Sequence, residues 1–224
     1  MGEVNYRKRL GKWLRIAVHV GSLVPLVLLI WDYFQGNLGF NPVQTVQQRT
    51  GRIAVIILIL SLACTPIKNV FLLPQIGRLR KPLGLYAALY AVLHFAAFAI
   101  WDYGLNLNLI WIEIYDKPFI LVGLFALIIL TVLAATSFRI SRKKLGKWWV
   151  WLHRLVYLAA VLVIVHYLLA VKGDLFSLQG AYTTPLIAGG ILLVLFLLRI
   201  PAIFLPLRNV FGKKRESQKA KPKN

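Results

Sequence analysis

All four histidines of the chain lie within or at the edge of strongly apolar segments. His153 and His166 share one such segment, His94 lies in the middle of another, and His19 belongs to the first. A bilayer is a poor solvent for an imidazole without a role, so a histidine inside a membrane is a functional candidate. Imidazole is also a common axial ligand of haem iron. The first hypothesis is therefore electron transfer within a membrane.

The composition defines the class of protein and limits how a cofactor could be attached. The chain has 224 residues, of which 59% are hydrophobic, and its mean hydropathy is +0.70. A soluble domain is about half apolar, so this is a membrane protein. Its one cysteine, Cys64, excludes an internal disulfide, a CxxCH haem attachment and a cysteine-ligated iron–sulfur cluster. Any haem would be bound without a covalent link.

Six apolar segments are long enough to be candidate spans, since a bilayer core requires about 20 residues. They are Ile16–Trp31, Thr50–Thr65, Leu83–Trp101, Pro118–Ala135, Trp148–Val171 and Ala181–Leu198. The first resembles a signal peptide, but no small-residue cleavage site follows it, so we interpret it as a retained helix. The second is the weakest, because Thr65-Pro66 is expected to end it. It would be tilted, extended backwards through Val46, or shielded by protein.

The charged residues segregate along this topology. Of the 27 Lys and Arg residues, 23 lie on one side of the predicted membrane. They are found before the first span, between spans two and three, between spans four and five or at the start of span five, and after the sixth span. The other side has Arg49, Arg52, Lys117 and Lys172, and five of the seven acids: Asp32, Asp102, Glu113, Asp116 and Asp174. Because cytoplasmic loops carry the excess of Lys and Arg, both termini are expected in the cytoplasm. The net charge of +20 is then a topology signal, which argues against nucleic acid as a partner.

The predicted fold is an all-α, six-helix transmembrane bundle. It covers residues 1–211, and a basic, disordered cytoplasmic tail is expected over 212–224. No internal repeat is apparent, and no GxGxxG motif occurs. The stretch after the sixth span is too short for a nucleotide-binding domain, so electrons would have to come from another molecule.

Helical rise places two histidines at the same depth. Counted from the cytoplasmic ends of their spans, His94 and His166 both lie about 17 Å into the membrane. Two imidazoles at matched depth on different helices are the geometry of a bis-histidine haem. His153 lies roughly 20 Å below His166, at the cytoplasmic boundary, and His19 shares its depth.

Two features of these spans leave alternatives open. Gly84, Ala87 and Ala91 stack on the face of His94, where small residues would leave room for a macrocycle or permit close helix packing. His153 and His166 are about 140° apart around a straight helix, so they cannot both face one cofactor. His153 would serve a second haem, face a flavin or quinol, or cap an interface.

Several sequence blocks resemble the ferric-reductase-like transmembrane family. They are Arg78-Leu-Arg-Lys-Pro-Leu-Gly-Leu-Tyr with Leu93-His94-Phe95, Lys144-Leu-Gly-Lys-Trp with Leu152-His153-Arg154-Leu-Val-Tyr157 and His166-Tyr167, Thr50-Gly-Arg52, and Thr65-Pro66. The resemblance covers nearly the whole chain. Within the family, the form without a nucleotide-binding domain resembles the haem-binding membrane subunits of bacterial periplasmic methionine sulfoxide reductase systems.

The resemblance implies a multi-pass protein of the bacterial inner membrane that binds one or two b-type haems. It would pass electrons from the quinone pool or a cytosolic flavin reductase to a periplasmic molybdopterin-containing reductase that repairs oxidised methionine, and FMN is an associated cofactor. By position, His94 and His166 are the axial ligands and His153 is a second ligand. Larger relatives carry two histidines on the third span, where this chain has only His94. A second haem would therefore need His19 or a non-histidine ligand opposite His153.

Other functions were weighed against the electron-transfer subunit, whose substrate would be reduced on its partner. A self-contained ferric or quinone reductase would need its own donor site. A transporter usually places acids in the middle of the membrane, whereas the seven acids here lie in loops or at span ends. A non-redox assembly subunit would use the histidines only for packing. For the electron-transfer subunit, the acidic outer loop Asp102–Asp116 is one candidate docking surface.

Overall fold

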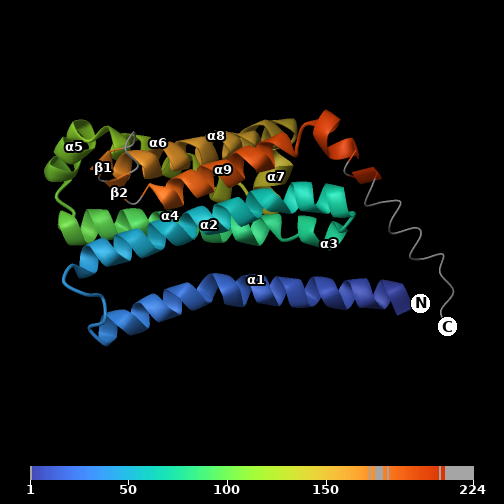
Figure 1. The fold of residues 1–224 in the computed structure, drawn as a ribbon, viewed down its shortest axis with the longest axis horizontal. Coiled ribbons are helices and arrows are strands. Elements are labelled where there is room, and N and C mark those ends of the chain that lie inside the picture. The colour runs from blue at the N-terminus through green and yellow to red at the C-terminus, as the bar shows by residue number, and fades with distance from the viewer. Residues whose placement is uncertain (1, 172, 175–178, 181, 207, 210–224) are drawn as a thin grey trace.

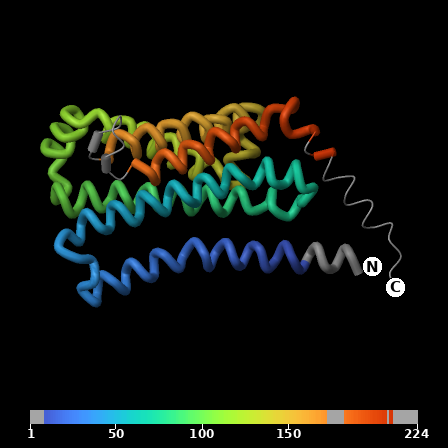
Figure 2. The backbone as a smooth tube through the Cα atoms, in the orientation of Figure 1, coloured from blue at the N-terminus to red at the C-terminus, as the bar shows by residue number. Residues whose placement is uncertain are grey.

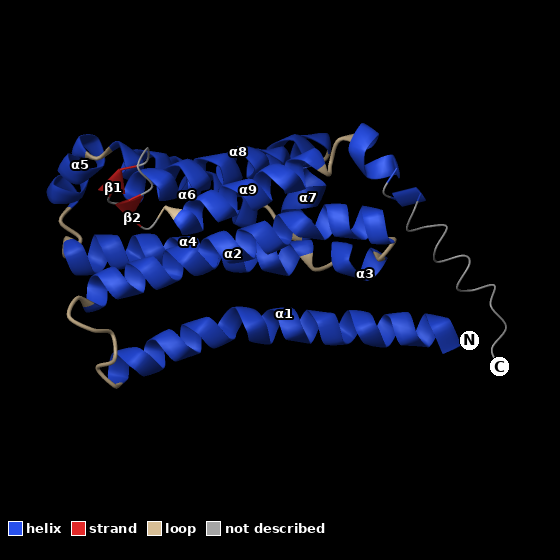
Figure 3. Ribbon diagram, in the orientation of Figure 1, coloured by secondary structure: helices blue, strands red, loops and turns tan. Residues whose placement is uncertain are grey.

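The chain is almost entirely helical. A computed structural model describes residues 2–171, 173–174, 179–180, 182–206 and 208–209. The helices are α1 (Gly2–Phe34), α2 (Pro42–Phe71), α3 (Pro74–Gly77), α4 (Arg80–Ala97), the π-helical turn η1 (Phe98–Asp102), α5 (Leu107–Asp116), α6 (Pro118–Ala135), α7 (Arg139–Leu145), α8 (Lys147–Ala170) and α9 (Thr183–Leu197). Two short antiparallel strands, β1 (Gly173–Asp174) and β2 (Gln179–Gly180), pair Gly173 with Gly180 (Figure 3).

The all-α membrane fold predicted from the sequence is confirmed. Within the described residues, five helical segments have the length and composition to cross a membrane: Arg9–Phe34, Pro42–Phe71, Pro74–Asp102, Pro118–Ala135 and Lys147–Ala170. The sixth predicted span corresponds to α9, a shorter apolar helix of 15 residues. The predicted tail, 212–224, lies outside the described residues.

Two antiparallel hairpins form the centre of the bundle. One pairs α2 with α4 and the other pairs α6 with α8, and α9 packs against α2 and α8 (Figure 1). Helix α1 runs alongside and contacts α2, α3 and α4. Figure 2 shows that α1 begins and α9 ends at one end of the bundle, near α3 and α7. We call this the basic end, and the opposite end, with α5 and the strands, the acidic end, because the charges separate in this way.

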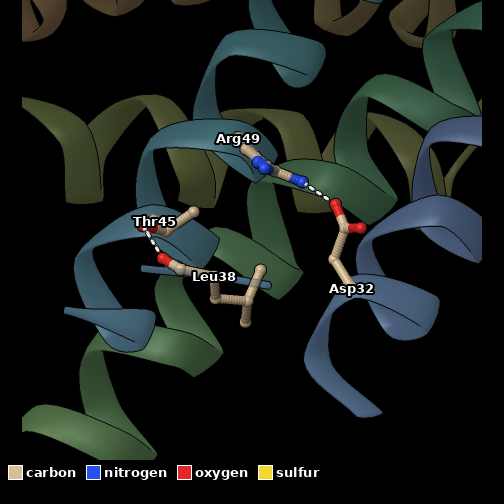
Figure 4. A network of polar contacts seen from close by, with 4 residues as sticks. All are labelled: Asp32, Leu38, Thr45 and Arg49. Atoms are coloured by element: carbon tan, nitrogen blue, oxygen red, sulfur yellow. Dashed lines mark hydrogen bonds and ion pairs between the residues drawn. The ribbon is translucent and has the colours of Figure 1, made fainter. Parts of the chain in front are cut away.

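The link from α1 to α2 is fixed by side chains at the acidic end. Asn41 caps α2 by accepting a hydrogen bond from the backbone of Gln44, and Pro42 follows at the first helical position, which proline favours. The hydroxyl of Thr45 donates to the carbonyl of Leu38 at 2.8 Å, and Arg49 on α2 forms an ion pair with Asp32 on α1 (Figure 4). These contacts set where the two helices meet.

The main core lies where the two hairpins and α9 converge. It is built from buried residues of α2, α4, α6, α8 and α9, among them Leu62, Ala87, Tyr90, Ala159 and Leu192. The hydroxyl of Tyr90, a fully buried side chain on α4, donates to the carbonyl of Ser22 on α1 at 2.7 Å. In an apolar interior this bond gives the phenol its partner and ties α1 to the bundle.

The predicted break at Thr65-Pro66 is wrong, because α2 continues through Pro66 to Phe71. Of the three alternatives for this span, extension backwards through Val46 is observed, because α2 begins at Pro42. Proline lacks the N–H that would bond the carbonyl four residues earlier, which here belongs to Leu62. Arg199, beyond α9, donates to this carbonyl at 2.6 Å and also to the hydroxyl of Tyr157 on α8. A partner from elsewhere in the fold thus satisfies the freed group and lets the helix continue.

A double-mutant cycle tests this interaction. Arg199→Leu should lower the free energy of unfolding by about 1.5–3 kcal/mol, the usual value for a hydrogen bond to a charged group. In a Pro66→Ala background the helix supplies its own N–H to Leu62, so the cost of Arg199→Leu should become smaller. Thermal unfolding in detergent measures both effects, and Arg139→Leu on α7 is the exposed control. Equal costs of Arg199→Leu in the two backgrounds would contradict the assignment.

Candidate functional site

The fold brings His94 of α4 and His166 of α8 together at the centre of the bundle. Their ring centroids are 6.1 Å apart, and the ring planes are inclined at 79°. Nδ1 of His94 forms a hydrogen bond with the carbonyl of Gln47 on α2 at 2.9 Å. Nδ1 of His166 forms one with the carbonyl of Phe119 on α6 at 2.7 Å. Each hairpin therefore orients its own histidine through the backbone of the partner helix.

These hydrogen bonds determine the chemistry available to the pair. A carbonyl only accepts, so each Nδ1 carries the proton and each Nε2 keeps a lone pair. Metal-bound histidines typically donate their second nitrogen in this way, which fixes the tautomer and the ring orientation. Two metal–nitrogen bonds of about 2 Å, added to the radii of two imidazole rings, give a centroid separation of about 6 Å. The observed spacing fits two imidazoles that share one metal ion.

Two glycines let the rings reach these carbonyls. A Cβ on Gly51 of α2 would lie 3.1 Å from Nδ1 of His94, and one on Gly123 of α6 would lie 2.6 Å from Nδ1 of His166. Each glycine is four residues after the accepting carbonyl, one turn along the same face. The histidine thus occupies the space that a side chain at this position would fill.

This common geometry reveals an internal repeat that the sequence analysis missed. His94 and His166 are 72 positions apart, and so are their carbonyl partners and the two glycines. The same offset aligns further identical residues without a gap, namely Ala54 with Ala126, Ile56–Leu58 with Ile128–Leu130, Ala63 with Ala135, Leu83 with Leu155, and Ala87–Ala88 with Ala159–Ala160. The hairpins α2–α4 and α6–α8 therefore share one arrangement of histidine, carbonyl and glycine, and they face each other across the histidine pair.

The small residues beside His94 serve helix packing. Ala87 is fully buried in the protein core, and a Cβ on Gly84 would lie 3.5 Å from the hydroxyl of Ser61 on α2. Ala159, the equivalent of Ala87 on α8, is buried as well. Of the two readings of these residues, the geometry favours close helix contact for Gly84 and Ala87.

His153 and His19 lie apart from this pair. The ring of His153 stacks on Trp149, one turn earlier on α8, at a centroid distance of 3.9 Å, and its Nδ1 lies 3.1 Å from the carbonyl of Trp149. Its Nε2 is buried and has no hydrogen-bond partner among the described residues. Nδ1 of His19 on α1 lies 2.9 Å from the hydroxyl of Tyr86 on α4. No ring contact or hydrogen bond in the described part of the chain joins His153 to His19.

A helical membrane bundle with two facing histidines on its central hairpins defines a class of proteins. Residues 50–164, half of the chain, match the family described as "ferric reductase like transmembrane component", and the chain belongs to this family. The matched region begins beside Gly51 and ends two residues before His166.

One of its relatives is similar in length. The chain is 43% identical over 189 residues to the protein-methionine-sulfoxide reductase heme-binding subunit MsrQ of Deinococcus radiodurans, over 84% of this chain and 90% of the relative. The resemblance inferred from the sequence blocks is thereby confirmed.

Sequence reasoning found the histidine pair but missed what holds it. Every residue has a carbonyl, so nothing in the residue types at Gln47 and Phe119 marks them as acceptors. The two glycines were the available signal, because each lies 43 positions before a histidine in a hairpin of equal length.

Gly123→Ala tests the close approach of His166. The added methyl group would displace a buried ring from its hydrogen bond, so the free energy of unfolding should fall by about 1–3 kcal/mol. Gly190→Ala on α9 is the matched control, because nothing lies within 4 Å of its Cβ position. It should stabilise the helix by about 0.5–1 kcal/mol. Thermal unfolding in detergent measures the change in stability of both variants. Equal changes in Gly123→Ala and Gly190→Ala would contradict the close approach of His166 to Gly123.

Proposed function

We propose that this chain is a b-type haem subunit that carries electrons across the bacterial inner membrane to a periplasmic methionine sulfoxide reductase. The observation that carries the proposal is the spacing of His94 and His166, together with the carbonyl bound to each Nδ1. Membership of the ferric-reductase-like family and the name of the relative from Deinococcus radiodurans support it.

The residues of the site fit a haem iron between two histidines. His94 and His166 would hold the haem iron through Nε2, while the carbonyls of Gln47 and Phe119 accept hydrogen bonds from Nδ1 of each ring. A b-type haem, when bound, supplies a one-electron carrier. Bis-histidine ligation and burial tune the potential of such a carrier. The hydrogen bonds to Nδ1 make the imidazoles more basic, which favours the ferric state.

We infer the orientation in the membrane from the charge distribution. We place the basic end in the cytoplasm and the acidic end in the periplasm, because loops rich in Lys and Arg remain on the cytoplasmic side. The histidine pair lies within the membrane-spanning segments of α4 and α8, between these two ends. Electrons would enter from the quinone pool or a cytosolic flavin reductase and leave near the periplasm.

Helix α5 is our candidate docking surface for the periplasmic reductase. It lies at the acidic end and exposes 64% of Trp111 and 90% of Tyr115, and exposed aromatic residues are enriched at protein interfaces. Asp116 and Glu113 add negative charge. A hydrogen bond from Lys117 lowers the pKa of Glu113, so this carboxylate is ionised at neutral pH.

We propose His153 as a second cofactor contact on the cytoplasmic side. Its buried Nε2 has no hydrogen-bond partner among the described residues, so it keeps the capacity to bind a haem, flavin or quinol. His19 of α1, whose Nδ1 lies 2.9 Å from the hydroxyl of Tyr86 on α4, is a further candidate.

Spectroscopy of histidine variants tests the haem site. Purified protein should show b-type absorption bands after reduction, and His94→Ala or His166→Ala should abolish most of this signal. His19→Ala should preserve it. Ring planes inclined at 79° should also give the strongly anisotropic low-spin ferric EPR signal of perpendicular imidazoles. If both His94→Ala and His166→Ala retain wild-type spectra, these residues are not the ligands.

Reoxidation kinetics test the direction of transfer and the docking surface. Chemically reduced protein should be reoxidised by a purified periplasmic methionine sulfoxide reductase supplied with its substrate. Trp111→Ala should slow this reaction at least tenfold, since an interface aromatic is worth about 2 kcal/mol, and should leave reoxidation by a ferric chelate unchanged. Trp148→Ala at the basic end, equally exposed, is the control. Fast reoxidation by ferric chelates alone would favour a self-contained reductase.

A further inference from the structure

A shallow, open cavity of about 290 Å³ lies between α1 and α4 at the basic end. It is lined by Arg15 and His19 of α1, by Arg78 in the turn before α4, and by Lys81, Pro82 and Leu85 in the first turns of α4. The lining holds three cationic side chains and no acid. Three positive charges around one hollow repel each other, and an anion between them would relieve this repulsion.

The internal repeat shows that this end is not a copy of its counterpart. The offset of 72 positions assigns Lys81 of the first hairpin to the place that His153 occupies in the second. The hydrogen-bonded histidines and glycines are the same in both hairpins, whereas at the basic end one hairpin has an imidazole and the other a cation. Lys81 packs over the ring of Phe138 and also lines the cavity. The α2–α4 hairpin therefore places the positive charge of Lys81 at the contact between α1 and α4, which we call the seam.

An apolar track continues from the cavity toward the centre of the membrane. On α4, Leu89 and Val92 follow Leu85 at helical spacing and are 40% and 42% exposed. On α1, Leu23 follows His19 by one turn and is 41% exposed. Only 11% of the most apolar window of α1 is buried in the protein, against 44% for α2. The seam between α1 and α4 thus carries cationic side chains at the basic end and exposed apolar side chains further into the membrane.

We propose that this seam binds one anionic phospholipid, with its phosphate among Arg15, Arg78 and Lys81 and an acyl chain along Leu85, Leu89 and Val92. Basic pockets between membrane helices are suited to anionic headgroups, and each cation near the surface adds to the attraction. A quinone, which has no charge, would leave the three cations without a counterion. A free phosphate would not use the apolar track.

Lipid titration followed by native mass spectrometry tests the site. The probes are dioleoyl phosphatidylglycerol, dioleoyl phosphatidylcholine and inorganic phosphate, added to delipidated full-length protein in a neutral detergent. The triple variant Arg15→Gln, Arg78→Gln and Lys81→Gln should bind phosphatidylglycerol about 100-fold more weakly, which corresponds to roughly 1 kcal/mol per cation. The matched control removes Arg139, Lys143 and Lys144, three exposed cations of α7 at the same end, and should change affinity less than threefold.

Each outcome decides for or against the lipid. Preference for phosphatidylglycerol over phosphatidylcholine, lost only in the cavity variant, supports the site. Equal loss in the α7 control indicates general attraction to the basic end and overturns it. Competition by millimolar inorganic phosphate would assign the cavity to a free anion, and displacement by a short-chain quinone would assign it to the quinone pool. The single variant Lys81→Glu, which should also abolish the preference, keeps the test valid if the triple variant does not fold.

Discussion

The hydrogen bond from each imidazole to a helix carbonyl is the interaction on which the centre of this molecule depends. A bilayer core provides no water, so a buried ring nitrogen needs a partner within the protein. Here the partner is the backbone of the adjacent helix, and a glycine one turn further gives the ring access to it. One contact in each hairpin therefore sets three things. It fixes how closely the two helices approach, how the imidazole ring is oriented, and that Nε2 keeps its lone pair.

This contact occurs twice, once in each hairpin. Both hairpins run in the same sense, from the acidic end to the basic end and back. The hairpins diverge toward the basic end, where His153 and Lys81 occupy equivalent positions. The histidine pair is common to both hairpins, and the differences lie at the basic end.

The sequence was sufficient for the helices and for the pairing of His94 with His166. Apolar length predicts spans, and a fixed rise per residue predicts depth. Sequence reasoning failed where the hydrogen-bond partner is far away in the chain, or where the residue type of the partner does not mark it as one. Pro66 was expected to end α2, but the carbonyl it frees is bound by Arg199, 137 positions from Leu62. The repeat was missed because apolar helices draw on few residue types, and only the shared geometry distinguishes its matching positions.

The contact between Arg199 and Leu62 also bears on how the chain is made. Helix α2 leaves the ribosome long before Arg199 does, and at about 5–20 residues per second the 137 positions between Leu62 and Arg199 take roughly 7–27 s. During this interval the Leu62 carbonyl lacks its final partner. The hydrogen bonding of α2 is therefore complete only when the segment after α9 has joined the bundle.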